Sequence, residues 1–275
     1  MATNKVLYIS QEIAPYLPKT AMSVLGQKLP QGIQEKGAEV RTFMPKYGRI
    51  NERRNQLHEV IRLSGMNLVI DDTDHPLIIK VATLQPARIQ IYFIDNDDYF
   101  IHNVNAKDNN EEKELEIKEF PADNDERIMF YVRGVVETVK KLRWEPSIVH
   151  CSGWISALAP LYLKRIYNED PSFRSAKIVY AIFDEKFEGT LDPRMQEKLK
   201  MEQFNDEDLK TLSDAPVDYI ALNKLAIDYA DAIVQASPEI SPELEEYAKA
   251  SGKPFLPYPG DEDYIDAYND FYASL

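Results

Sequence analysis

The residue types that most often carry catalysis are few and scattered in this chain. Its four histidines, His58, His75, His102 and His150, lie far apart and form no His-Glu-x-x-His pair, so metal catalysis has no support. The single cysteine, Cys151, excludes an internal disulfide and a multi-cysteine zinc site, and we expect a buried, small apolar residue there. No dinucleotide-binding G-x-G-x-x-G, P-loop or G-x-S-x-G motif occurs. These patterns predict no metal site and no cofactor.

The charge balance of the chain limits its partners. Among 275 residues there are 32 Lys and Arg against 46 Asp and Glu, which gives a net charge of −14. A chain this acidic, without a stripe of basic residues, is a poor match to nucleic-acid phosphates or to anionic membrane surfaces. We therefore expect no nucleic acid and no membrane as partners. An anionic ligand would need a locally basic site, because the overall electrostatic field of the chain is negative.

Composition and the first residues indicate the class of protein. Hydrophobic residues make up 44% and aromatic residues 11% of the chain, which is typical of globular proteins. The opening stretch, MATNKVLYIS, has no basic region and no long apolar run, and no transmembrane pattern follows. The sequence predicts a cytoplasmic location.

The apolar pattern predicts strands that alternate with helices. Lys5 to Ser10 is a short buried strand, and Met22 to Lys36 has apolar residues at helical spacing, with Gly37 closing the helix. A second strand follows at Glu39 to Met44, so the chain opens as a parallel, doubly wound sheet. Later strands are expected at 147–151, 177–183 and 232–236, and helices at 123–141, 155–167, 223–229 and 238–250.

The segment between residues 57 and 95 has a different pattern. Leu77 to Thr83 and Arg88 to Ile94 are strands with no helix between them, which indicates an added antiparallel hairpin region. The polar stretch 103–118 is predicted to be a surface loop. Asp123 and Glu126 have the spacing of a capping box. The fold class is thus α/β, a Rossmann-like, doubly wound, mainly parallel sheet with an antiparallel hairpin region.

The last residues carry an apolar stripe of their own. We expect a main unit at 1–255 and a tail at 256–275 that forms an amphipathic helix. Its stripe comprises Tyr264, Ile265, Tyr268, Phe271 and Tyr272. Packing on its own domain is favoured, because terminal helices usually cover cores, and docking on a partner is the alternative.

Several short motifs occur in order over residues 5–245. The segments, each with the pattern that it matches, are 10–15 (S-x-E-x-x-P), 19–23 (K-T-G-G-L), 44–48 (L-P-x-Y-G), 92–100 (Y-x-x-D-x-x-x-Y-F), 123–127 (D-N-x-E-R), 149–154 (V-H-x-H-D-W), 157–163 (A-L-x-P-x-Y-L) and 230–238 (A-D-x-V-x-T-V-S-P). Any one motif is a weak signal, but the ordered set is specific. Together they resemble the N-terminal domain of bacterial glycogen and starch synthases.

This resemblance implies one half of a GT-B fold, in which two Rossmann-like domains face each other across a cleft. It also implies the family's activity, glucosyl transfer from ADP-glucose or UDP-glucose to an α-1,4-glucan with retention and without an essential metal. Substrate-binding positions carried over by the motifs are Lys19, Thr20, His150, Ser152, Trp154 and Asp184.

Several of the family's site residues are replaced. Ala21 and Met22 stand in place of two loop glycines, which let a backbone approach a ligand closely. Ser152 and Gly153 replace a histidine and an aspartate, and Phe183 replaces a second site histidine. The stretch after Pro257 is too short for the family's second domain, which carries most of the nucleotide-binding groups. We therefore assign no catalytic residue.

Each candidate position also has a structural interpretation. Lys19 can be a solvated lysine, His150 a hydrogen-bonded core histidine, Trp154 a core aromatic and Asp184 part of a charged loop. Three functions stay open. The first is a non-catalytic homologue that binds nucleotide sugar or α-glucan in glucan metabolism. The second is a transferase completed in trans by a second protein that supplies the missing domain. The third is an interaction protein without a ligand.

Overall fold

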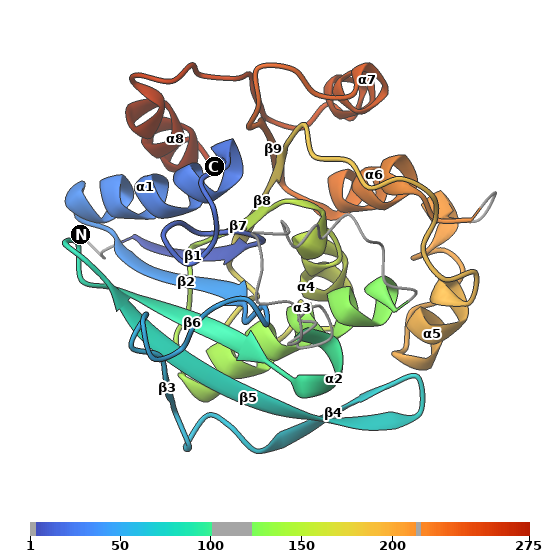
Figure 1. Ribbon diagram of the computed structural model, residues 1–275. Helices are drawn as coiled ribbons and strands as arrows, with labels where there is room; N and C mark the ends of the chain where they lie inside the picture. Colours follow the sequence, from blue (N-terminus) through green and yellow to red (C-terminus); the bar gives the residue numbers. More distant parts are fainter. Residues whose placement is uncertain (1–3, 101–122, 213–215) are drawn as a thin grey trace, which may run out of the picture.

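The computed structural model of the protein describes residues 4–100, 123–212 and 216–275, and a ten-stranded sheet runs through them (Figure 1). All neighbours from β10 to β6 are parallel, which confirms the predicted α/β class. The loop expected at 103–118 lies outside the described residues, as does His102. The strand order is β10 (Phe255–Leu256), β9 (Ala232–Gln235), β8 (Lys177–Ile182), β7 (Ile148–Ser152), β1 (Lys5–Ser10), β2 (Glu39–Pro45), β6 (Ile89–Asp95), β5 (Thr73–Leu84) and β3 (His58–Glu59), with β4 (Met66–Ile70) paired to β5.

The antiparallel region is confirmed and is larger than the sequence pattern indicates. β5 pairs with β6 in antiparallel register, with Val81 opposite Tyr92. β3 and β4 also pair with β5, and the sequence pattern did not predict either of them. The β4–β5 turn consists of Asp71 and Asp72, both with positive φ (43° and 64°). Asp tolerates this conformation better than most residues, but it is a weaker turn signal than glycine.

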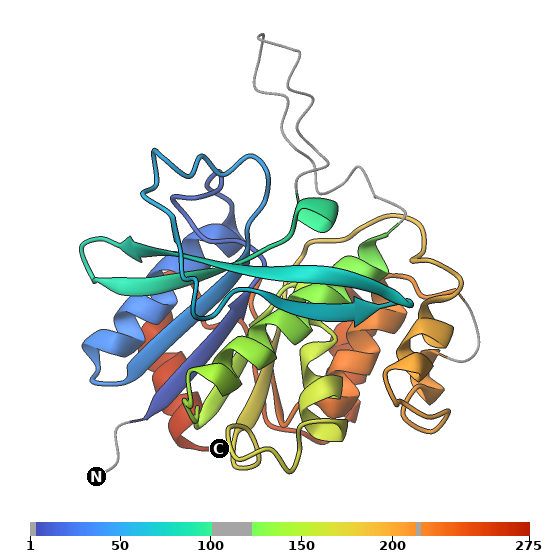
Figure 2. The same cartoon turned by 90° about the horizontal axis from the view of Figure 1, so that it is seen from below.

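Helices cover both faces of the sheet (Figures 1 and 2). On one face, α1 (Ala21–Glu35) and α8 (Tyr264–Ala273) pack on the strands. On the other face lie α3 (Asn124–Lys141), α4 (Ala159–Arg165) and α6 (Tyr219–Tyr229), and Figure 2 shows β4 and β5 running along α3. None of the described helices is both long and apolar enough to cross a bilayer. The other helical segments are α2 (Asp97–Phe100), α5 (Met195–Met201), α7 (Pro242–Ala250) and the 3-10 turns η1 (Trp154–Ser156) and η2 (Lys210–Leu212).

Some predicted helix ends are right and others are wrong. Gly37 follows the C-cap of α1 with a φ of +98°, as expected for a glycine that closes a helix. The capping box at the start of α3 is wrong, because the side chain of Asp123 makes no cap hydrogen bond. Its carboxylate instead accepts hydrogen bonds from Arg127 at 3.0 and 3.1 Å, and Glu126 turns to the hydroxyl of Tyr99 at 3.0 Å. An arginine one turn later thus competes for the capping carboxylate.

Three other helices differ in their limits from the predicted ones. The segment expected at 155–167 is divided into η1 and α4, and α7 begins at Pro242. α6 starts earlier than expected, at Tyr219, because Asp218 caps it by accepting a hydrogen bond from the backbone N–H of Ala221 at 2.8 Å.

The terminal helix α8 lies against α1 (Figure 1). Its Tyr268 and Tyr272 are 1% and 7% exposed and join the apolar cluster on this face of the sheet. Gly32 of α1 permits the close approach, since a Cβ there would lie 2.5–2.9 Å from three side-chain atoms of Ile265. β10, Phe255–Leu256, lies across the expected boundary between the main unit and the tail.

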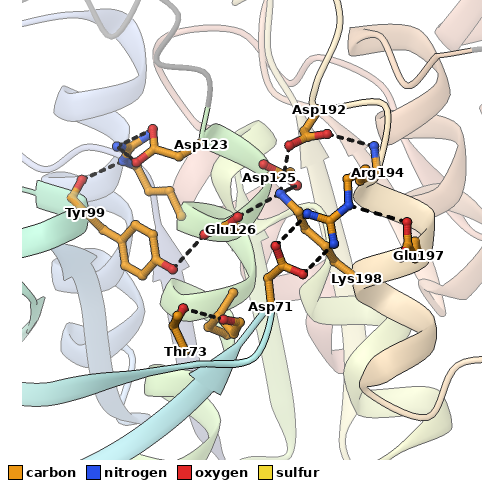
Figure 3. Close-up of polar contacts among 12 residues, drawn as sticks. Asp71, Thr73, Tyr99, Asp123, Asp125, Glu126, Asp192, Arg194, Glu197 and Lys198 are labelled. Carbon is orange, nitrogen blue, oxygen red and sulfur yellow. Dashed lines mark hydrogen bonds and ion pairs between the residues drawn. The ribbon is translucent and has the colours of Figure 1, made fainter.

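Lys198 of α5 lies among three carboxylates, two from the first turn of α3 and one from the segment before α5 (Figure 3). Its Nζ is 2.8 Å from Asp125 Oδ2, 2.7 Å from Glu126 Oε1 and 2.9 Å from Asp192 Oδ2. The side chains of Lys198 and Asp125 are 2% and 0% exposed. Burial lowers the pKa of Lys198, but the hydrogen bonds to the three carboxylates reverse this and raise it above its ordinary value. Lys198 therefore stays charged and holds α5 to the beginning of α3.

Arg194, at the beginning of α5, connects this helix to the β4–β5 turn (Figure 3). Its Nη1 and Nη2 lie 2.9 and 2.8 Å from the two carboxylate oxygens of Asp71. Because the Arg194 side chain is half exposed, this pair contributes little to stability and serves to position the turn.

Lys198→Met tests whether the buried network stabilises the fold. Removing the cation leaves Asp125, Glu126 and Asp192 facing one another, so we expect the free energy of unfolding at pH 7 to fall by about 3–5 kcal/mol. Without the cation, the pKa values of these carboxyl groups are higher in the native state than in the unfolded state. The native state of the variant therefore binds more protons, and the loss in free energy of unfolding becomes smaller as the pH falls. Urea denaturation of both proteins at pH 5 and pH 8 measures this. Lys28→Met, at an exposed site on α1, is the control, and a loss that grows toward pH 5 would contradict the prediction.

Gly32→Ala tests the packing of α8 on α1. Alanine favours an isolated helix by about 1 kcal/mol over glycine. In this protein its Cβ would overlap Ile265, so we expect a net destabilisation of about 1–3 kcal/mol. In an Ile265→Ala background the same change should be neutral or stabilising. Thermal denaturation of the four proteins decides this, and equal stabilisation in both backgrounds would show that α8 does not pack at Gly32.

Candidate functional site

All but one of the expected site positions lie where the parallel strands end. Ser152 ends β7, Trp154 follows it, Asp184 follows β8, and Lys19 and Thr20 lie in the connection from β1 to α1. The carboxyl ends of β1, β7 and β8 are aligned, because Ser10 pairs with Ser152, and Ser152 with Ala181. In open α/β sheets, ligands bind outside this edge. We name it the carboxyl edge.

Thr20 caps α1 and brings a carboxylate to its amino end. Its Oγ1 accepts a hydrogen bond from Ser23 N at 2.9 Å, and its backbone N–H donates to Ser23 Oγ at 2.8 Å. The same hydroxyl donates to Glu12 Oε2 at 2.7 Å. Burial raises the pKa of Glu12, opposed by this hydrogen bond and by the charge of Arg49. The positive end of the helix dipole is thus close to a carboxylate of the protein itself. Lys19 is exposed.

Met22 and Gln11 fill the space beside Gly153. Ala21 and Met22, at the positions of the family's glycines, form the first turn of α1, and Met22 is 2% exposed. Gly153 has a φ of +81° and a ψ of 165°, a conformation that other residues rarely adopt. A Cβ on Gly153 would lie 2.5 Å from Gln11 Oε1 and 3.0 Å from Met22 Cε. The aspartate that the family resemblance implies at this position would not fit beside these side chains.

Gln11 holds this arrangement together, and sequence reasoning missed it. Its amide donates to Glu185 Oε2 at 2.9 Å, and its Oε1 accepts from the backbone N–H of Ile155 at 3.4 Å. The hydroxyl of Tyr47 donates to the Gln11 carbonyl at 3.1 Å. Gln11 occupies an unspecified position of the S-x-E-x-x-P motif, so the family pattern contains no signal for it.

His150 lies inside β7 and away from the carboxyl edge. It is 1% exposed, and its Nδ1 is 2.9 Å from the hydroxyl of Tyr272 on α8. The rings of Tyr8 and Tyr268 lie 5.3 and 5.8 Å from its ring. Burial lowers the pKa of His150 to about 3, so it is neutral at physiological pH. Its place is that of a core histidine covered by α8.

The other expected positions differ in their exposure. Trp154 is 4% exposed and packs edge-on against Phe187, with ring centroids 5.1 Å apart. Ser152 is 6% exposed, whereas Asp184 is exposed and its backbone N–H donates to Ser237 Oγ at 3.0 Å. The structure thus brings Ser152 and Trp154 together with Gln11, and leaves Lys19 and Asp184 at the rim. Within residues 4–100, 123–212 and 216–275, no group of three or more His, Cys, Asp or Glu could hold a metal ion.

Gly153→Ala measures how tightly the carboxyl edge is filled. We expect a loss of about 1–3 kcal/mol from the positive φ and the overlap with Gln11 and Met22. Part of this loss should disappear in a Met22→Ala background, with a coupling energy of about 0.5 kcal/mol or more. Urea denaturation of the double-mutant cycle measures the coupling. Strictly additive losses would mean that Met22 does not occupy the space beside Gly153.

Comparisons with known proteins agree with this fold. Residues 5–253 match the family model described as starch synthase catalytic domain. Glycogen synthase of Chlorobium phaeovibrioides is 33% identical over 240 residues, which cover 87% of this chain and 47% of that protein. Glycogen synthase of Chlorobium chlorochromatii is 37% identical over 186 residues, which cover 68% of this chain and 37% of that protein. The chain therefore spans less than half the length of these curated relatives.

A solved structure shows the same architecture. The catalytic domain of starch synthase IV from Arabidopsis thaliana, bound to ADP and acarbose, aligns with a TM-score of 0.72 and 18% identity, over 94% of this chain and 51% of that chain. At this identity the likeness concerns the fold, one half of a GT-B glycosyltransferase. The match over residues 5–253 and the identity to glycogen synthases show the family as well as the fold. This chain belongs to the glycogen and starch synthase family of GT-B glycosyltransferases.

Proposed function

We propose that this chain does not transfer glucose by itself and acts in glucan metabolism by binding α-glucan at the carboxyl edge. The observation that carries the proposal is the packing of Met22 and Gln11 around Gly153. These side chains take up the space next to a residue that is an aspartate in the family. A buried methionine and an internally bonded amide therefore stand where the family resemblance implies an acidic side chain.

The charges at the carboxyl edge favour a neutral glucan over a nucleotide sugar. Glu12 lies at the positive end of α1, where a phosphate would gain most from the helix dipole. Asp184 and Glu185 add two acidic residues after β8. A diphosphate would be repelled by these carboxylates, whereas sugar hydroxyls can donate hydrogen bonds to them. The starch synthase IV structure is bound to both ADP and acarbose, and we extend only the glucan-like ligand to this chain.

The loss of imidazole from the carboxyl edge also supports the proposal. Phe183 and Ser152 replace the family's histidines, and both are buried. Of the histidines in the described residues, His150 is inside the sheet, and His58 and His75 belong to the antiparallel region. None of them can contact a sugar bound at the ends of β7 and β8. The chain therefore lacks, in its described part, the imidazole groups that the family places near the sugar.

Calorimetric titration with maltoheptaose, ADP-glucose and UDP-glucose tests the choice of ligand. We expect maltoheptaose to bind and the nucleotide sugars not to bind. Asp184→Ala should weaken maltoheptaose binding roughly tenfold, because a charge-assisted hydrogen bond is lost. Asp206→Ala, at an exposed position between α5 and η2, should leave the affinity unchanged.

The remaining outcomes separate the competing functions. No binding of maltoheptaose would overturn the glucan proposal and favour an interaction protein without a ligand. Incorporation of glucose into glycogen by the pure protein would overturn the non-catalytic proposal. Incorporation only after a separate nucleotide-binding domain is added would show a transferase completed in trans.

A further inference from the structure

A cavity lies on the opposite edge of the sheet from the proposed glucan site. It has a volume of about 430 Å³. Arg41 belongs to the amino-terminal half of β2, and Lys141 is the last residue of α3, which returns the chain to the amino ends of the parallel strands. We name this cavity the basic pocket. Its lining consists of Arg41, Arg62, Gln90, Tyr92 and Lys141 with Leu63 and Leu142, and it includes no acidic side chain.

Arg41 is held in place from several sides. Its guanidinium group lies 5.1 Å from the ring centroid of Trp144 and 5.9 Å from that of Tyr92. Its Nη1 donates to the Tyr92 hydroxyl at 3.1 Å, and that hydroxyl donates to Gln90 Oε1 at 3.0 Å. The stacked guanidinium is therefore preorganised, and a ligand would lose little entropy by ordering it.

The carboxylate nearest to Arg41 has another partner. Glu39 Oε1 lies 3.8 Å from Arg41 Nη2, and it accepts a hydrogen bond from Trp144 Nε1 at 2.6 Å. A pair at this distance, with a half-exposed carboxylate, compensates the charge of Arg41 only weakly.

Arg62 and Lys141 add two further positive charges to the lining of the pocket. Lys141 Nζ lies 3.4 Å from the carbonyl oxygen of Leu63, which keeps it beside the pocket. Its neighbour Lys140 is paired with Glu137 at 3.0 Å. Burial raises the pKa of Tyr92, and the charges of Arg41 and Arg62 oppose that rise, so both guanidinium groups act on the same hydroxyl.

We propose that the basic pocket binds a small phosphate monoester, with Arg41, Arg62 and Lys141 contacting the phosphate. In a chain of net charge −14, three cations around one cavity form the local exception that an anionic ligand requires. A phosphate monoester carries a charge of about −1.5 to −2 at pH 7 and offers acceptor oxygens for arginine. This proposal does not depend on the glucan site.

The size and lining of the pocket favour an ester over free phosphate. Cavities of roughly 300–1,000 Å³ accommodate small organic ligands, and about 430 Å³ exceeds what a single phosphate ion fills. Gln90 and the Tyr92 hydroxyl can hydrogen-bond to hydroxyl groups, and the only aliphatic lining residues are Leu63 and Leu142. A sugar phosphate has this combination of one dianionic group and several hydroxyls.

Calorimetric titration of the full chain at low ionic strength tests the proposal. The probes are glucose 6-phosphate, ribose 5-phosphate, glucose and inorganic phosphate. We expect the sugar phosphates to bind more tightly than inorganic phosphate, and glucose not to bind at this site. Arg62→Gln and Lys141→Gln should each weaken sugar phosphate binding about tenfold or more, since each removes a charge-assisted contact. Both side chains are exposed, so the variants should fold normally, which circular dichroism checks.

Lys28→Gln on the other face of the sheet is the matched control and should leave the affinity within about twofold of the parent, as expected for a distant screened charge. Lack of sugar phosphate binding at millimolar concentration would overturn the proposal. Binding that Arg62→Gln and Lys141→Gln do not weaken would place the anion elsewhere and overturn it equally. Equal affinity for inorganic phosphate would contradict the assignment to an ester.

Discussion

Gly153 directly follows β7 and has a φ of +81°. The side chains of Gln11 and Met22 occupy the space that a side chain at this position would need. The arrangement of the carboxyl edge depends on this packing. Met22 begins α1 where the family has a glycine, and Gly153 stands where the family has an aspartate. The two replacements are complementary, since the side-chain volume lost from the strand end is supplied by the helix. In our proposal, this packing stands in place of the acidic group that the family resemblance implies at the end of β7.

Much of the fold could be predicted from the sequence, because its signals are local. Apolar runs such as Lys5–Ser10 identify the parallel strands, and the periodic pattern of 124–141 identifies α3. The parts that failed depend on side-chain and strand partners that a local pattern does not specify. The capping box failed because Arg127, one helical turn later, takes the carboxylate of Asp123. β3 and β4 are short or partly exposed strands, whose patterns are weak until β5 lies beside them.

The places of the candidate residues follow from the strand pattern, but their contacts do not. The family motifs put candidate residues at the ends of β7 and β8, whereas His150 lies within the sheet beneath α8. Gln11 was missed because its partner Glu185 lies 174 residues away in sequence. The basic pocket likewise joins residues from two strands, a connecting turn and a helix end. No short motif contains such a set, so only the three-dimensional structure reveals it.

Our proposal requires Met22 to stay packed beside Gly153 when a nucleotide sugar is present, and the Met22 methyl group reports on this contact directly. The measurement is a titration of methyl-¹³C-methionine-labelled protein with ADP-glucose, with the Met22 signal assigned by its absence in Met22→Leu. We expect this signal to show a nuclear Overhauser effect to the α protons of Gly153 and to stay unchanged at millimolar ADP-glucose. A shift of the Met22 methyl signal with loss of the contact to Gly153 would show that the methionine moves aside for the nucleotide sugar, and would contradict the proposal.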